Sequence, residues 1–180
     1  MITEEYREQN RQLHENPHYG TSGSLWAKET ASLYNKYGCT TVLDYGAGKC
    51  TLGKALPHLM IRNYDPCIEG MDDPPAPADL VVCGDVMEHI EEQYVDDVLD
   101  HIQTLARKVV FFVIATYPAQ KTLPDGRNAH ITVRSTNWWI EQLLRRWSLR
   151  SVQMITVGKD GIERFSLNCT AVPIKEEVTQ

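Results

Sequence analysis

Three short apolar segments alternate with segments of helical periodicity, and this order constrains the fold more than any other feature of the chain. The apolar segments are residues 40–45, 80–83 and 109–115, and helical spacing is found at 51–56 and 95–106. Strands separated by helices favour a mainly parallel sheet with helices on both faces. In such sheets, ligands bind beyond the carboxyl ends of the strands. The residues that directly follow each apolar segment are therefore the first candidates for a functional site.

The remaining segments complete an α/β fold of the Rossmann-like type. A weaker strand is expected at 60–64, and two strands that form a C-terminal antiparallel hairpin are expected at 149–157 and 163–173, joined by the turn residues Gly158, Lys159, Asp160 and Gly161. Further helices are expected at 4–13, 25–37 and 137–147, the last capped by Ser135 or Thr136. These patterns predict a mostly parallel sheet of six strands.

Size and composition exclude several classes of protein. With 180 residues the chain suits one domain, and we expect residues 1–180 to form it, with 1–37 as a helical N-terminal cap. A net charge of −6 makes the binding of nucleic acid an unfavoured function. The longest apolar run, 109–115, is too short to cross a membrane. The five cysteines form no C-x-x-C pair, which indicates a reducing environment. The N-terminal segment resembles no targeting signal, so we expect a cytoplasmic location.

A glycine-rich turn follows the first apolar segment and precedes a helix. It consists of Asp44, Tyr45, Gly46, Ala47 and Gly48. Two glycines allow a tight turn and a close approach of a ligand to the backbone. The segment lacks the first glycine and the Ser or Thr of a P-loop, and it lacks the third glycine of a dinucleotide fingerprint. The dinucleotide pattern is thus weakened but stays an alternative. A D-x-G-x-G turn whose carboxylate suits a ligand with an ammonium group is the third possibility, beside the alternative of a turn that binds nothing.

Two further acidic sites follow the next strands. Asp65, before Pro66, lies about 20 residues beyond the glycine turn, where an acid can accept hydrogen bonds from ribose hydroxyls. The run from Asp85 through Val86, Glu88 and His89 follows the strand at 80–83. Glu88 or His89 could accept or relay a proton. The alternatives are an Asp-Pro turn at 65–66 and a helix cap at Asp85.

Taken in order, VLDYGAG, YDP and ADLVVCGDVMEHI resemble the motifs of class I S-adenosylmethionine-dependent methyltransferases that act on small molecules. The resemblance covers most of residues 40–115. It implies that Asp44 to Gly48, Asp65, Pro66, Asp85 and Val86 bind S-adenosylmethionine. The family usually has a further helix and strand where this chain has only the proline-rich segment 66–78, so we expect a trimmed sheet.

The loop at 116–131 is the fourth place where chemistry is expected. A long loop in a compact domain is often functional, and this one carries Asp125, Arg127, Asn128 and His130. The resemblance places a histidine here that faces the acceptor, so His130 is a candidate general base. Asp125, Arg127 and Asn128 are candidates for binding the acceptor, together with Tyr19 of the N-terminal region. A surface turn at Asp125 is the alternative explanation.

These observations predict an enzyme that transfers the methyl group of S-adenosylmethionine to a small-molecule or glycan-type acceptor. Its expected catalytic residues are Glu88, His89 and His130. A non-catalytic protein or partner subunit that binds S-adenosylmethionine is the alternative. We predict no metal site, and the sequence identifies neither the acceptor nor the oligomeric state.

Overall fold

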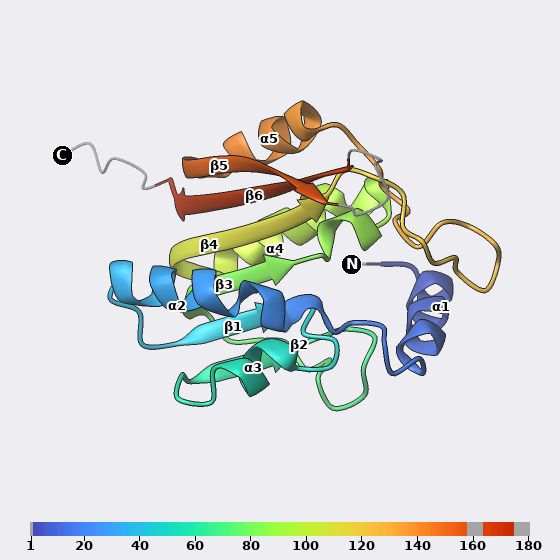
Figure 1. Ribbon diagram of the computed structural model, residues 1–180, viewed down its shortest axis with the longest axis horizontal. Helices are drawn as coiled ribbons and strands as arrows, with labels where there is room; N and C mark the ends of the chain where they lie inside the picture. Colours follow the sequence, from blue (N-terminus) through green and yellow to red (C-terminus); the bar gives the residue numbers. More distant parts are fainter. Residues whose placement is uncertain (1, 158–163, 175–180) are drawn as a thin grey trace.

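A computed structural model describes residues 2–157 and 164–174 of the chain, and within them six strands form one sheet. The strand order is β2-β1-β3-β4-β6-β5 (Figure 1). The first four of these strands are parallel, and β6 runs antiparallel to both β4 and β5. The strands are β1 (Val42–Tyr45), β2 (Ile61–Tyr64), β3 (Ala78–Gly84), β4 (Ala106–Ala115), β5 (Trp147–Val157) and β6 (Arg164–Pro173). The predicted mostly parallel sheet with a C-terminal antiparallel pair is confirmed.

Helices cover both faces of the sheet, and each face has its own apolar core. On one face α4 (Val95–Leu105) and α5 (Thr136–Leu144) pack on the side chains of β3, β4 and β6. On the other face α2 (Ala27–Lys36) and α3 (Thr51–Ala55) pack on β1, β3 and β4. Fully buried valines, leucines and phenylalanines of β3 and β4 supply both cores. Burial on both faces explains why these two strands are continuous apolar runs.

The N-terminal helix α1 (Glu4–His14) lies beyond the carboxyl ends of the parallel strands (Figure 1). Thr3 caps it, since its hydroxyl accepts a hydrogen bond from the Tyr6 N–H. A 3₁₀ helix, η1 (Ser22–Trp26), leads from α1 into α2. The loop that follows β4 lies at the same end of the sheet (Figure 1).

The sheet is shortened at its β2 edge, as the proline-rich segment 66–78 led us to expect. β2 is an edge strand, because its only partner among the described residues is β1. The chain passes from β2 to β3 through turns and bends. The expected loss of one strand and helix from this region is therefore confirmed.

Most predicted segments differ from the observed bounds by one to three residues, and two helices show why. The helix expected at 25–37 begins as η1 and becomes α-helical only at Ala27. The helix expected at 137–147 ends at Leu144, and Trp147 already belongs to β5, where it pairs with Pro173 and packs on Phe112. Tertiary burial of the indole thus overrides the helical spacing. Ser135 is the predicted cap of α5. The predicted hairpin turn at Gly158 to Gly161 lies outside the described residues.

No helix within residues 2–157 and 164–174 is both long and apolar enough to cross a bilayer.

Candidate functional site

A cavity of about 880 Å³ opens at the carboxyl end of the sheet, beneath α1. Cavities of about 300–1,000 Å³ are typical of small-molecule sites. Nine of the residues predicted for the site line it: Tyr19, Gly46, Gly48, Asp65, Pro66, Asp85, Val86, His89 and His130. The structure thus brings the turns after β1, β2 and β3 together with the N-terminal region and the loop after β4.

The glycine turn has the backbone that its sequence predicted. Gly46 and Gly48 both have positive φ values, 79° and 50°. A Cβ atom on Gly48 would lie 2.5 Å from the carbonyl oxygen of Gly20. The same oxygen accepts a hydrogen bond of 2.7 Å from the Lys49 N–H. The N-terminal segment therefore packs directly on the turn, and only a glycine at position 48 permits this contact.

Asp44 is a buried carboxyl group with an unused oxygen. Its side chain lies in a small recess that shares Gly20, Trp26 and Asp85 with the wall of the main cavity. No described residue donates a hydrogen bond to its Oδ2 atom. Burial, and then the nearby carboxylate of Asp65, raise the pKa of Asp44 to about 7. A cationic group in the recess would satisfy this oxygen and lower the pKa.

Asp65 fixes the turn at the end of β2. Its Oδ2 accepts the Gly48 N–H at 3.0 Å, and its Oδ1 accepts the Cys67 N–H at 3.0 Å. The imidazole Nε2 of His14 lies 4.0 Å from the same carboxylate. Each carboxylate oxygen has about two lone pairs, so Asp65 keeps acceptor positions for a ligand in the cavity.

Asp85 has a strained backbone with φ of 57°. Its Oδ2 accepts a hydrogen bond of 3.1 Å from the indole Nε1 of Trp26. Burial raises the pKa of this carboxyl, and hydrogen bonds from Ser22 and Trp26 act in the opposite direction. Asp85 thus connects the turn after β3 to η1 at the cavity wall.

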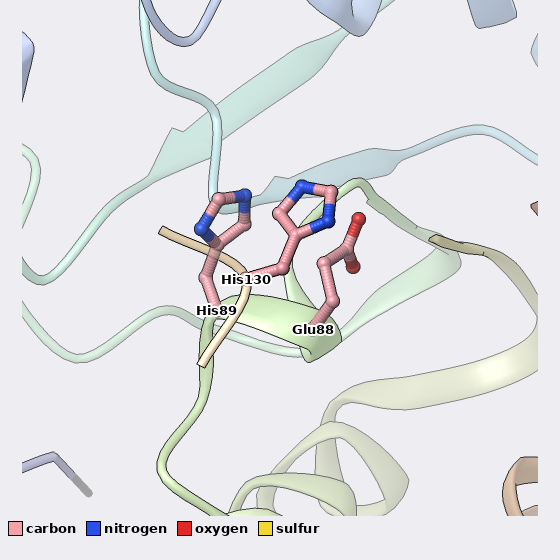
Figure 2. Close-up of side chains that lie close together, drawn as sticks. All are labelled: Glu88, His89 and His130. Carbon is pink, nitrogen blue, oxygen red and sulfur yellow. The ribbon is translucent and has the colours of Figure 1, made fainter. Parts of the chain in front are cut away.

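Glu88, His89 and His130 lie close together (Figure 2). The two histidines line the cavity, and Glu88 is completely buried. Glu88 and His89 belong to the 3₁₀ helix η2 (Met87–His89), and His130 comes from the loop after β4. One ligand atom of each residue lies within 4.8 Å of the others. Tyr19 faces the same group, with its hydroxyl 3.4 Å from Nδ1 of His89.

Burial determines the protonation of these three groups. Desolvation lowers the pKa of His89 to about 3 and also lowers that of His130. Burial raises the pKa of Glu88 well above its usual range. Both imidazoles are therefore neutral at pH 7 and can accept a proton or another ligand.

Seven predicted site residues are not among those that line the main cavity. Asp44 and Ala47 line the small recess, Glu88 is completely buried, and the remaining four lie elsewhere. Tyr45 points to the other face of the sheet, where its ring packs on Tyr64 and its hydroxyl lies 3.0 Å from Nδ1 of His101. The other three organise the loop after β4. The Asp125 carboxylate binds Arg127 at 2.6 Å and accepts a hydrogen bond from Gln9, and Asn128 bonds both the N–H and the carbonyl of Ala119.

Among the cavity-lining residues that the sequence did not predict are two that contact predicted site residues directly. Trp26 holds Asp85, and His14 lies beside Asp65. Each comes from the N-terminal region and reaches a turn that follows a distant strand. The sequence carries no spacing signal for either contact, because the path of residues 15–26 determines them.

Comparisons with known proteins identify the fold. No family model matches the chain, and no curated protein sequence matches it. Solved structures do match. The 1,6-didemethyltoxoflavin-N1-methyltransferase of Burkholderia thailandensis, bound to 1,6-didemethyltoxoflavin and S-adenosylhomocysteine, is 17% identical with a TM-score of 0.60. The match covers 92% of this chain and 83% of that enzyme. Magnesium protoporphyrin IX methyltransferase of Synechocystis PCC 6803, bound to S-adenosylhomocysteine, is 15% identical with a TM-score of 0.59. The match covers 84% of this chain and 83% of that enzyme.

A third match is a putative S-adenosylmethionine-dependent methyltransferase of Listeria monocytogenes. It is 14% identical with a TM-score of 0.59, covering 86% of this chain and 99% of its own. The chain therefore has the fold of the class I methyltransferases that its motifs resemble. At these identities the comparisons establish the fold alone, and the chemistry depends on the site.

Proposed function

We propose that this protein binds S-adenosylmethionine in the cavity and transfers its methyl group to a small-molecule or glycan-type acceptor. The observation that carries the proposal is the buried, unpartnered Oδ2 of Asp44, next to a glycine turn that is open to the cavity. A buried carboxylate needs a partner, and the methionyl ammonium of the cofactor is a cation of suitable size.

The other cavity residues fit the rest of this cofactor. Gly46 and Gly48 line the cavity. Because they carry no Cβ, Val86 and the Gly20 backbone pack directly against the turn and hold its backbone at the cavity wall. Asp65 retains acceptor positions for the ribose hydroxyls, and Pro66 and Val86 offer apolar surface for the base and the thioether. The bound cofactors in the matching structures, S-adenosylhomocysteine in two of them, support the same assignment.

In this proposal the cofactor supplies an electrophilic methyl group, and the protein aligns the acceptor for in-line displacement. The acceptor occupies the part of the cavity bounded by Tyr19, His89 and His130. Nδ1 of His130 donates to the Tyr117 carbonyl oxygen at 2.6 Å, which leaves Nε2 with its lone pair. In the simplest form of the mechanism, His130 accepts the proton of the acceptor, and Glu88 and His89 position the His130 imidazole.

A small acceptor agrees with the size of the cavity, and the two named enzymes with matching structures act on small molecules. We also propose that residues 1–37 cap the cofactor, supported by the contact of Gly20 with the glycine turn. Five free cysteines support the proposed cytoplasmic location.

The experiment is a methyl-transfer assay with S-adenosylmethionine labelled on the methyl group, across a panel of small hydroxylated and amino-containing acceptors and glycan precursors. We expect label in at least one acceptor and release of one S-adenosylhomocysteine per methyl transferred. The Asp44→Asn variant should lose this activity, whereas Asp97→Asn, at an exposed position of α4, should keep it. Cofactor binding without turnover on any acceptor would favour a non-catalytic binding protein instead.

A further inference from the structure

The cluster of Glu88, His89 and His130 contains two imidazoles and one carboxylate from two separate segments of the chain (Figure 2). Proton transfer needs one such group, and the proposed methyl transfer gives the other two only a positioning role. The three ligand atoms lie within 4.8 Å of one another, and the two histidines line the cavity. Two neutral nitrogens and one oxygen are a ligand set found in metal sites with open positions.

Backbone hydrogen bonds orient both imidazoles in the same way. Nδ1 of His89 lies 2.8 Å from the carbonyl oxygen of Ala129, and Nδ1 of His130 lies 2.6 Å from that of Tyr117. A carbonyl only accepts, so each Nδ1 carries the proton and each Nε2 keeps its lone pair. Histidines that bind metals usually donate their other N–H to a carbonyl or carboxylate in this manner.

Glu88 supplies an oxygen that no protein group uses. Its side chain is completely buried, and its Oε1 accepts the Ala115 N–H at 3.1 Å. Its backbone carbonyl accepts the N–H of Thr132, which ties η2 to the segment just after His130. Oε2 has no hydrogen-bond partner among the described residues. A buried carboxylate oxygen without a partner is costly, unless a ligand satisfies it.

We propose that Glu88, His89 and His130 bind one divalent first-row transition metal ion, such as Zn²⁺, Mn²⁺, Fe²⁺ or Co²⁺, at the wall of the cavity. Ligand atoms at about 2.1 Å from a tetrahedral ion lie about 3.4 Å apart. The side chains therefore move inward by about an ångström when the ion binds. Nitrogen ligands disfavour Mg²⁺ and Ca²⁺, which take oxygen ligands.

Three protein ligands leave coordination positions open, and the cavity is the space that these positions face. An oxygen or nitrogen atom of the acceptor fits these open positions. If this atom belongs to a hydroxyl group, the ion lowers the pKa of that hydroxyl. This part of the inference rests on the proposed function, and it replaces proton acceptance by His130. The metal site itself does not depend on methyl transfer and departs from our sequence prediction of no metal site.

The experiment is a titration of the full-length, chelator-treated protein with Co²⁺, followed by visible ligand-field absorption. We expect one ion per chain, which Zn²⁺ displaces and excess Mg²⁺ does not. His130→Gln and His89→Gln should each weaken Co²⁺ binding at least about tenfold. His58→Gln, at an exposed position outside the cavity, should leave it unchanged. Circular dichroism of each variant verifies that it is folded.

A second measurement uses the unaltered protein, in case a variant does not fold. Histidine nitrogen NMR spectra with and without Zn²⁺ should show shifts for the Nε2 atoms of two histidines and not for the other four. No saturable Co²⁺ binding, or binding that both variants retain, would overturn the proposal. S-adenosylmethionine binding is measured separately on the metal-free protein. A negative metal titration therefore leaves the cofactor assignment unchanged, and absence of cofactor binding leaves the metal result unchanged.

Discussion

In the proposed function, Asp44 is the residue on which cofactor binding depends most. Replacing it with Asn keeps the shape of the side chain and removes the charge that faces the methionyl ammonium. Because a buried charge then loses its partner, we expect the dissociation constant for S-adenosylhomocysteine to rise about 30-fold or more. Isothermal titration calorimetry measures the change, with the exposed Asp97→Asn as the matched control. Equal affinities of the two variants would contradict the role of Asp44.

The raised pKa of Asp44 makes cofactor affinity depend on pH. With a pKa of about 7, most Asp44 side chains are protonated at pH 6, and affinity for the ammonium should increase about fivefold from pH 6 to pH 7. Asp44→Asn should bind weakly with no such increase. Calorimetry at a series of pH values tests this, and an increase that persists in the variant would assign it to another group.

The same pKa predicts an opposite trend for stability without cofactor. The folded pKa lies above the ordinary value of 3.8, so the folded state holds more protons than the unfolded state between these values. The contribution of Asp44 to the free energy of unfolding is therefore present below about pH 4 and is lost as the pH rises to about 7. Urea unfolding at pH 5 and pH 8 measures this loss. The free energy of unfolding should fall between the two pH values by an amount that is present with Asp44 and missing in Asp44→Asn.

Gly48 tests the contact between the glycine turn and the N-terminal region. A Cβ at this position meets the backbone oxygen of Gly20 at 2.5 Å, and φ is positive. Gly38 also has positive φ, but nothing lies within 4 Å of its Cβ position. Gly38→Ala should cost about 1–2 kcal/mol through backbone strain alone, and Gly48→Ala should cost clearly more. Urea unfolding of both variants measures the difference, and equal losses would show that the contact is unimportant.

At the scale of elements, Glu91 holds the beginning of α1. Glu91 accepts hydrogen bonds from the N–H of Thr3 at 2.7 Å and from its hydroxyl at 3.1 Å. Removing them with Glu91→Ala should loosen the cap over the cavity, and we expect a several-fold loss of S-adenosylhomocysteine affinity with faster proteolysis near α1. Glu92→Ala, which removes an exposed ion pair with Arg134, should change neither. Proteolysis time courses and calorimetry on both variants are the measurements.

The arrangement of elements was largely predictable because the strands are periodic and apolar. The sheet, its antiparallel end and the shortened edge at 66–78 all followed from runs of valine, leucine and proline. The position of Tyr45, predicted as a cofactor-binding residue, also follows from the alternation of a strand. Successive side chains of a strand point to opposite faces, so Asp44 in the recess implies that Tyr45 lies on the other face, as the structure has it.

At the scale of the whole molecule, the site depends on loops whose paths no pattern predicts. The turn residues after β1, β2 and β3 could be predicted, because carboxyl ends of parallel strands meet at one edge. The approach of His130 to His89 depends on hydrogen bonds within the loop after β4, including those of Asn128. Asn128 was expected to bind the acceptor, and its side chain bonds to the loop backbone instead.

The most direct test of the account is calorimetric titration of the purified protein with S-adenosylmethionine and S-adenosylhomocysteine, with NADH and ATP as controls. We predict saturable binding of the first two at one site per chain and no binding of the controls. Tight NADH binding, or no heat with either sulfur ligand, would contradict the assignment of Asp44, Asp65 and the glycine turn to this cofactor and leave only the fold established.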